Sequence, residues 1–395
     1  MSDDSRSGAP AVMLLCDYSL HYLGGAQTAF MRQARSLAAE GWKVVVVAPD
    51  SDVLAGTPGI LIASPVVRRT FPVLDLPILG DRSRLQADVA VMARRHRVRA
   101  LVVHSEFTLA AVALGVGAEL GIPVLHTVHT FFWHAPIILS PFAPGIRWFH
   151  RRLTGIPSVD RCHGGTPVDN ALRGMTLRVA LRADGVLSPS EHQARALRAA
   201  GVASARAFSN VSEPLQPAPL RRCGPLTLVW AARFAPEKRL QVALDAVRLV
   251  TARLGPGRVH LHVAGGRHRA QTDVTFHGRV PATRVAELMT RSDAVLITSF
   301  GFDNQPMIAL EGFTRARPVI VSDPALAAEF GAAAIGTVTP DAAGLADTLT
   351  GLVADRGALT DAAAAALAYA RARRPAAHAA DLRAAIDGVS ANRRA

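Results

Sequence analysis

Short apolar runs alternate with longer segments of helical periodicity along most of the chain, and this alternation restarts near residue 226. The runs that predict strands cover residues 12–18, 43–48, 100–104, 123–129, 185–188, 226–231, 259–264, 274–277, 294–298 and 318–322. Strands that alternate with helices form parallel sheets that are buried on both faces. The pattern therefore predicts an α/β fold with two doubly wound, Rossmann-like sheets.

A proline-rich segment separates the two halves of the pattern. Residues 210–225 contain Pro214, Pro217, Pro219 and Pro225, which is typical of a linker. At 395 residues the chain also exceeds the usual size of a single core. We expect an N-terminal domain at 11–209, a linker at 210–225, a C-terminal domain at 226–373 and a helical end at 374–395. The polar residues 1–10 are expected to be disordered.

Residues 299–323 carry the most informative group of side chains. Asp303 and Glu311 stand eight residues apart after the predicted strand at 294–298. Proline favours the first position of a helix, so we expect a helix to begin near Pro306 with Asp303 or Asn304 as its cap. An acid at the carboxyl end of a parallel strand lies where open α/β sheets bind ligands. The alternative is that Asp303 only caps the helix and that Glu311 is a solvated helical acid.

Two cations follow the first strand of the second half. Arg233 and Lys238 lie after residues 226–231, where the next helix is expected to start. The chain has only two lysines, Lys43 and Lys238. Cations at a strand-to-helix turn, next to the positive end of a helix dipole, suit a diphosphate group. The alternative is a solvated helix start.

Two further features lie in the first half. Gly24 and Gly25 follow the strand at 12–18 and precede a helical pattern that runs to Gly41, and glycines at such a turn let backbone N–H groups approach a phosphate or sugar closely. The same pair also serves packing alone, and the absence of G-x-G-x-x-G argues against a nicotinamide enzyme. His104 and His129 each end a predicted strand, a position that is either structural or functional.

Together these residues resemble the retaining glycosyltransferases of family four, in which the acid-x7-acid motif corresponds to Asp303 and Glu311. The family usually has Glu at the first of these positions. The resemblance implies the GT-B architecture, with two Rossmann-like domains that face a central cleft and a final helix that crosses back to the first domain. It also implies that the donor binds mainly to the C-terminal domain and the acceptor mainly to the N-terminal domain.

The resemblance assigns a role to each candidate residue. Arg233 and Lys238 would stabilise the leaving diphosphate, Asp303 would bind the transferred sugar and Glu311 the donor ribose, while His129 would lie near the reacting centre. The other expected donor contacts are Gly24, Gly25, Ala26, Gln27, Asn304, Gln305, Pro306 and Met307. The implied reaction moves a hexose from a nucleotide-diphosphate sugar to an acceptor with retention of configuration, without a cofactor or metal ion.

The change from Glu to Asp at residue 303 keeps two other functions open. Asp is shorter by ~1.5 Å, and misplacements near 1 Å cost active sites up to about 10²-fold in rate. A degenerate protein that binds sugar nucleotides without turnover is one alternative, and a GT-B sugar-nucleotide epimerase is the other. The acceptor is open as well, with envelope glycans, glycolipids and glycosylated metabolites as candidates in a bacterial genome that favours Arg and Ala.

A formal charge of +13 points to anionic partners. Nucleic acid is not expected, since no binding module is recognisable and the chain has only three Tyr and four Trp. Residues 131–152 interleave aromatic side chains with Arg147, Arg151 and Arg152, which suits an anionic membrane surface and a lipid-linked acceptor. The alternative is an insertion that packs on the domain or lines an acceptor pocket.

Other features of the sequence predict what the protein lacks. Asp50 and Asp52 have the spacing of metal-binding acids in another glycosyltransferase fold, but a polar strand-to-loop exit is the better interpretation. Cys16, Cys162 and Cys223 have neither disulfide nor metal-site spacing, and only His163 adjoins any of them. No secretory signal or uninterrupted apolar span is expected. These features favour the cytoplasm, or the inner face of a membrane.

Overall fold

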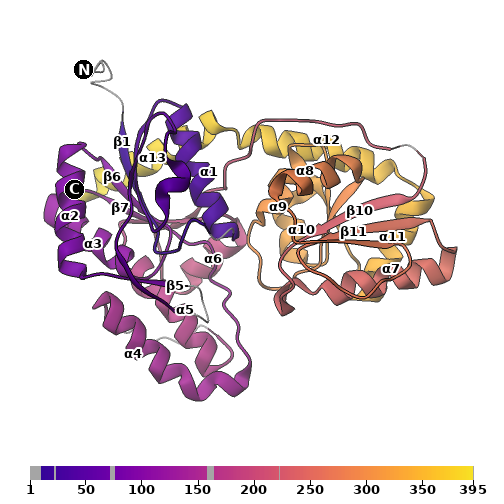
Figure 1. The fold of residues 1–395 in the computed structure, drawn as a ribbon, viewed down its shortest axis with the longest axis horizontal. Coiled ribbons are helices and arrows are strands. Elements are labelled where there is room, and N and C mark those ends of the chain that lie inside the picture. The colour runs from indigo at the N-terminus through magenta and orange to yellow at the C-terminus, as the bar shows by residue number, and fades with distance from the viewer. Residues whose placement is uncertain (1–9, 22–23, 72–75, 158–163, 222, 395) are drawn as a thin grey trace. The chain divides into compact units, whose positions relative to one another are not determined.

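The computed structural model describes residues 10–21, 24–71, 76–157, 164–221 and 223–394. The chain divides into two compact units: Met1–Val211 with Pro375–Ala395 form unit 1, and Ser212–Arg374 form unit 2 (Figure 1). The chain passes from unit 1 to unit 2 after Val211 and returns to unit 1 after Arg374.

The described part of unit 1 is built on a parallel sheet of seven strands, in the order β3-β2-β1-β6-β7-β8-β9. Its strands are β1 (Ala11–Leu15), β2 (Lys43–Val47), β3 (Ile60–Ala63), β6 (Ala100–Val103), β7 (Val124–Thr127), β8 (Gly185–Ser188) and β9 (Ala205–Ala207). Its helices are α1 (Gly25–Ala39), α2 (Arg82–Arg95), α3 (Thr108–Leu120), α4 (Ala143–Thr154), α5 (Pro167–Ala180), α6 (Glu191–Ala199) and α13 (Pro375–Arg394), with the 3₁₀ turns η1 (Ser51–Leu54) and η2 (Ile137–Phe142).

Strand β1 shows why this sheet is covered on both sides. All five of its residues are buried. Val12 and Leu14 pack with side chains of α1 and α13, whereas Met13 and Leu15 pack with side chains of α2 and α3 on the opposite face. Side chains alternate across a strand, so an entirely apolar strand requires cover on both faces.

The described part of unit 2 has a six-stranded parallel sheet in the order β12-β11-β10-β13-β14-β15. Its strands are β10 (Leu226–Ala231), β11 (Val259–Ala264), β12 (Val274–Gly278), β13 (Ala294–Ile297), β14 (Val319–Val321) and β15 (Ala334–Gly336). Its helices are α7 (Leu240–Leu254), α8 (Ala282–Arg291), α9 (Met307–Phe313), α10 (Pro324–Phe330), α11 (Ala342–Ala354) and α12 (Gly357–Ala372), with the 3₁₀ turns η3 (Pro236–Lys238) and η4 (Gly331–Ala333). Two doubly wound parallel sheets confirm the predicted α/β fold.

The sequence pattern did not predict every element. Strands β4 (Val67–Phe71) and β5 (Leu76–Leu79) form a separate antiparallel pair in which β4 is exposed throughout. The proline-rich segment is also bound to unit 2, because the buried guanidinium of Arg317 donates to the carbonyls of Ala218 and Pro219, each at 3.0 Å. No helix in the described ranges is long and apolar enough to cross a bilayer.

Candidate functional site

Each sheet has one point where the strand order reverses, and most of the predicted site residues follow strands at these points. In unit 2 the neighbours β10 and β13 lie at the reversal, and the loops after them carry the predicted cations and Asp303. In unit 1 the reversal lies between β1 and β6. Open α/β sheets bind ligands outside the carboxyl ends of strands at such points, because the flanking helices leave opposite faces of the sheet there.

The structure of unit 2 brings Lys238 and Asp303 together. Lys238 Nζ donates to both carboxylate oxygens of Asp303, at 2.6 and 2.9 Å. The two side chains are only 20% and 12% exposed, and the ring of Phe302 lies 5.3 Å from Nζ. A pair this sheltered is only weakly screened by salt. The site therefore presents a cation and an anion side by side at the edge of the sheet.

The loop that carries Lys238 is held by a hydrogen bond to the backbone carbonyl of Lys238. Thr298 Oγ1, just after β13, donates to the carbonyl of Lys238 at 2.8 Å, and the indole of Trp230 donates to Thr298 Oγ1 at 3.0 Å. The next residue, Arg239, has the left-handed φ of 50° and precedes α7. This chain of contacts fixes the lysine to both strands at the reversal.

The loop that carries Asp303 is held by Asp323. Gly301 adopts φ of 65°, a conformation that favours glycine, and its N–H donates to Asp323 Oδ2 at 2.7 Å. The other oxygen of Asp323 accepts from Ala325 N–H at 2.8 Å and so caps α10. Sequence analysis did not identify Asp323, although its place directly after a predicted strand was a usable signal.

The predicted helix cap is wrong. Helix α9 begins at Met307, Pro306 occupies the N-cap position, and no side chain caps this end. The carboxylate of Asp303 is taken by Lys238, since a charge-assisted bond to an ammonium is stronger than a bond to a backbone N–H. Asn304 is 4% exposed and does not cap the helix either. The interpretation of Asp303 as no more than a helix cap is thereby excluded.

The other predicted donor residues of unit 2 lie in the same two loops or in helix α9. Arg233 NH2 lies 3.6 Å from Glu237 Oε1, and its side chain is 62% exposed. Gln305 Nε2 donates to the Tyr369 hydroxyl at 3.0 Å, which ties the loop to α12. Glu311 lies within α9 and is partly buried, and Met307 is buried.

Gly265 and Gly266, after β11, are further residues that sequence analysis missed. A Cβ on Gly265 would lie 1.8 Å from the carbonyl oxygen of Ala232, and one on Gly266 would lie 2.8 Å from the ring of Phe234. Only glycine lets this loop approach the loop that carries Arg233 so closely. The paired glycines were the signal available in the sequence.

In unit 1 the glycine pair begins α1. Gly24 is the N-cap, with φ of −99°, and Gly25 is the first helical residue. A Cβ on Gly25 would meet nothing within 4 Å. Ala26 is partly buried and the Gln27 side chain is buried beneath this end. The residue before the pair, Leu23, lies outside the described residues.

His129 and His104, which follow neighbouring strands, form a pair. His104 Nδ1 and His129 Nε2 lie 2.9 Å apart, and one donates to the other. Burial lowers the pKa of His129 to about 4 and holds the pKa of His104 well below its ordinary value. Both imidazoles are therefore neutral at pH 7 and suit hydrogen bonding rather than charge.

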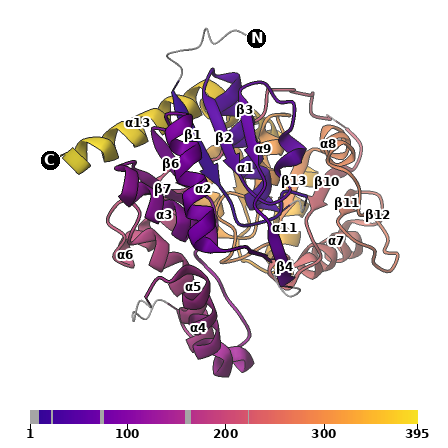
Figure 2. The same ribbon diagram turned by 60° about the vertical axis from the view of Figure 1, so that its left-hand side comes forward.

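Segment 131–152 forms η2, α4 and the loop before them. Phe131 is buried in the core, whereas the exposed apolar side chains are Ile137, Ile138, Leu139, Phe142 and Trp148. Figures 1 and 2 show α4 away from strands β1, β6 and β7 of unit 1. Among the aromatic side chains of this segment, Phe142 and Trp148 are therefore exposed and Phe131 is not.

The remaining predictions concern metal and thiol chemistry. Asp50 accepts a hydrogen bond from Ser19, and Asp52 lies 3.5 Å from His21 Nε2. Among the described residues no group of three acids, histidines or cysteines is arranged to hold a metal ion. Cys16 is buried and Cys223 exposed. Cys162 and its neighbour His163 lie outside the described residues.

Each half of the chain matches a glycosyltransferase family model. Residues 23–162 match the model of Glycosyltransferase Family 4, and residues 225–355 match that of Glycosyl transferases group 1. A phosphatidyl-myo-inositol mannosyltransferase of Mycobacterium leprae is 26% identical over 366 residues, which is 86% of each chain.

Solved structures share the fold. HepE from Anabaena, crystallised with UDP, has a TM-score of 0.68 at 14% identity and covers 96% of this chain and 100% of its own. Sucrose-phosphate synthase from Thermosynechococcus elongatus has a TM-score of 0.64 at 14% identity, with 97% and 100% covered. The two domain matches and this shared fold identify the chain as a glycosyltransferase of the family-four and group 1 type with the GT-B fold.

Proposed function

We propose that the protein transfers a hexose from a nucleotide-diphosphate sugar to an acceptor with retention of configuration and without a metal ion. The observation that carries this proposal is the pair of Lys238 and Asp303 at the strand reversal of unit 2. It offers a cation for the diphosphate and a carboxylate for sugar hydroxyls at one point. Relatives crystallised with UDP and with UDP-glucose support a donor of this class.

On donor binding, Lys238 exchanges the carboxylate of Asp303 for diphosphate oxygens. Its ammonium then stabilises the charge that develops on the leaving group, which is the type of interaction that contributes most to catalysis in such sites. The largely exposed guanidinium of Arg233 adds a second cation once it leaves Glu237. Asp303, released from the lysine, accepts hydrogen bonds from the transferred sugar.

The other proposed contacts follow the family. Glu311 binds the ribose, and the main chain of residues 304–307 supports the donor. In unit 1 the N-terminal end of α1, at Gly24, Gly25, Ala26 and Gln27, approaches the phosphate and sugar. His129, as a neutral imidazole, supplies a hydrogen bond near the reacting centre.

Nucleotide diphosphate release from a panel of donors, with and without candidate acceptors, tests the proposal. Release that requires an acceptor, with an α-linked product from an α-linked donor, supports retaining transfer. An isomerised donor formed without acceptor would establish the epimerase instead. Tight binding of a donor that is never consumed would establish a degenerate binding protein.

We also propose that the acceptor is lipid-linked and that unit 1 binds an anionic membrane, placing the protein at the inner face of that membrane. The binding surface, here called the apolar–basic surface, consists of Ile137, Ile138, Phe142, Trp148, Arg147, Arg151 and Arg152. The four apolar side chains are 65–78% exposed, and residues 131–152 contain no acid. Apolar side chains flanked by arginine suit a lipid interface with anionic headgroups. The name of the mycobacterial relative, which refers to a phosphatidyl lipid, agrees with such an acceptor.

Strand β4 extends this surface. The ring of Phe71 lies 5.7 Å from that of Phe149 on α4. Val66 is 75% exposed, and Arg68 and Arg69 are exposed beside it. Residues 60–71 also contain no acid, so the added area has the same chemistry as the helix.

Co-sedimentation with vesicles that contain phosphatidylglycerol tests this surface. Each arginine near such a membrane contributes about 1 kcal/mol, so changing Arg147, Arg151 and Arg152 together to serine should lower binding by roughly 10²-fold. Changing Arg94, Arg95 and Arg97 to serine removes the same charge from the end of α2 and the turn that follows it, and should leave binding nearly unchanged. Equal losses in both variants, or no binding by the unchanged protein at low salt, would contradict the proposal.

A further inference from the structure

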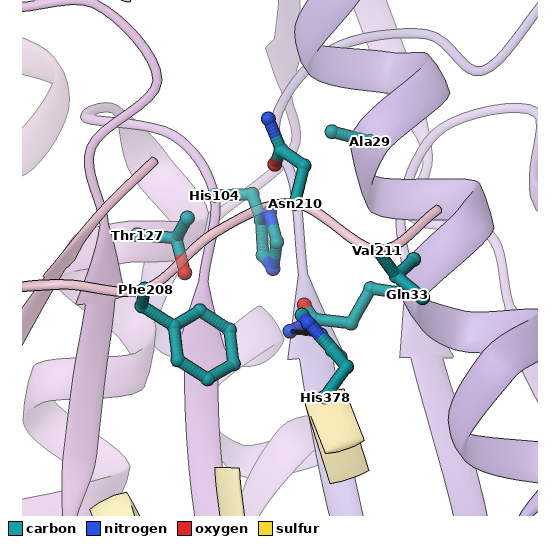
Figure 3. A pocket seen from close by; sticks show the side chains of 8 residues that line it. All are labelled: Ala29, Gln33, His104, Thr127, Phe208, Asn210, Val211 and His378. Atoms are coloured by element: carbon teal, nitrogen blue, oxygen red, sulfur yellow. Dashed lines mark hydrogen bonds between the residues drawn. The ribbon is translucent and has the colours of Figure 1, made fainter. Parts of the chain in front are cut away.

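A small buried cavity in unit 1 adjoins the histidine pair. Its volume is about 10 Å³, and its wall includes Gln33 of α1, His104, Thr127 of β7 and His378 of α13 (Figure 3). One ordered water needs roughly 10–15 Å³ of such space and two to four polar partners. The cavity therefore has about the size of a single water molecule.

Three polar atoms in the wall lack a protein partner. Gln33 Oε1, His104 Nε2 and Thr127 Oγ1 are fully buried, and within the described residues none of them has a hydrogen bond. Leaving a buried polar atom unpaired costs about 1–3 kcal/mol. Figure 3 shows the three side chains around the same space. A water there would satisfy all three atoms at once.

The orientation of Gln33 follows from the hydrogen bonds of His378. His378 Nδ1 lies 3.2 Å from the carbonyl of Ser209, which can only accept, so Nδ1 carries the proton. Burial lowers the pKa of His378 to about 4, so the ring is neutral and its Nε2 is an acceptor. The amide nitrogen of Gln33, 3.0 Å from that Nε2, is then the donor. The amide oxygen is left as an acceptor that requires a donor from the cavity.

We propose that this cavity binds one ordered water, which bridges Gln33 Oε1, Thr127 Oγ1 and His104 Nε2, and that Gln33 and Thr127 thereby act as positioning residues for His129. The path runs from His378 on the last helix, through Gln33 and the water, to His104 and then to His129 at 2.9 Å. The water restricts the ring orientation and the proton position of His104, and His104 restricts those of His129. The catalytic consequence rests on the role of His129 in the proposed function, whereas the water and the restriction do not.

Two variants and a matched control test this site. Thr127→Val removes the hydroxyl at constant shape, and Gln33→Met removes the amide. Ser36→Ala, three residues along α1 from Gln33, removes another buried hydroxyl that does not line the cavity. Crystal structures at high resolution should show the water in the unchanged protein and in Ser36→Ala, and should show it lost or displaced in the other two.

Nitrogen-15 NMR of the imidazoles reports on the histidines directly. The unchanged protein and Ser36→Ala should each give one tautomer of His104 and of His129, whereas both cavity variants should give averaged shifts. In an active enzyme, the kcat of the cavity variants should fall by about tenfold to a hundredfold with little change in KM. A dry cavity, or histidine shifts unchanged in folded Thr127→Val, would overturn the inference. If the cavity variants give averaged shifts but the unchanged protein has no transferase activity, the inference is supported and the proposed function is refuted.

Discussion

The carboxyl edges of the two sheets differ in the polar side chains that they present. In unit 2 the reversal presents Lys238 and Asp303, two full charges that face each other. In unit 1 the loops after β1, β6 and β7 carry Gly24, His104 and His129, and both imidazoles are neutral at pH 7 because burial lowers their pKa values. The same doubly wound topology therefore supports an ion pair in one unit and a neutral, hydrogen-bonding pair of histidines in the other.

The physical difference suggests a division of labour. A diphosphate carries most of the charge in the proposed reaction, and fixed charges stabilise it best where water is partly excluded. A hydroxyl or sugar has no charge to neutralise and is oriented by hydrogen bonds instead. Under this view a change of charge matters most in unit 2, and a change of proton position matters most in unit 1.

Removal of the cation of unit 2 should have the largest effect. Lys238→Met should lower kcat by about 10²–10³-fold, as loss of one preorganised donor usually does, and Arg233→Ala should also lower it strongly. Lys43→Met is the matched control, because Lys43 is the other lysine of the chain and is exposed at the start of β2. Steady-state kinetics with circular dichroism checks the result. Normal turnover in folded Lys238→Met and Arg233→Ala would remove this site from the mechanism.

The carboxylate should follow with a smaller effect. Asp303→Asn keeps the shape but leaves Lys238 without a charged partner, and we expect a loss of about tenfold to a hundredfold in kcat/KM. Asp303→Glu restores the residue usual in the family and should change the rate or the donor preference. Donor competition assays measure both. Equal kinetics for Asp, Asn and Glu would leave the ion pair with a structural role only.

Acid should destabilise the protein, chiefly through unit 1. Among the described histidines of this unit, five have strongly lowered pKa values: about 3 for His126, about 4 for His129, His150 and His378, and well below the ordinary value for His104. Between about pH 6.5 and 4 the unfolded chain binds protons that the folded chain does not, so the free energy of unfolding falls as the pH falls.

Two buried acids of unit 1 oppose this trend. Burial raises the pKa of Glu106 to about 8 and that of Asp17 to about 6, so the folded chain takes up these protons first. Stability should therefore change little between pH 8 and about 7 and then fall, by about 1.4 kcal/mol per pH unit for each net proton. Urea unfolding followed by hydrogen exchange, resolved for each unit, measures this. Unit 2 losing protection before unit 1 at pH 5 would contradict the comparison.

Removal of divalent metal should have the smallest effect. If Lys238 and Arg233 neutralise the diphosphate, EDTA should leave the transfer rate unchanged, and added Mg²⁺ should not raise it. Asp50→Asn should be equally silent. Turnover that requires Mg²⁺ would show that the cations of unit 2 are not sufficient for the leaving group.

The sequence by itself determined the fold class and the placement of the main site residues. Strands 12–15 and 294–297 carry apolar side chains on both faces. Both faces must therefore be covered by helices, as in a doubly wound sheet. Residues at strand ends, such as Asp303, His104 and His129, must then lie at the carboxyl edge. These conclusions rest on local pattern and on the period of side chains along a strand.

Tertiary structure decided which side chains meet. The sequence pattern suggested Asp303 as a helix cap, but the side chain of Lys238, from the loop after β10, forms an ion pair with it instead. Asp323 and Gly265 fix their neighbouring loops through contacts whose partners could not be predicted from the spacing of residues in the sequence. His378, near the end of the chain, reaches Gln33 near its beginning. Hydrogen bonds and ion pairs depend on distances of a few tenths of an ångström, and only the packed fold sets those distances.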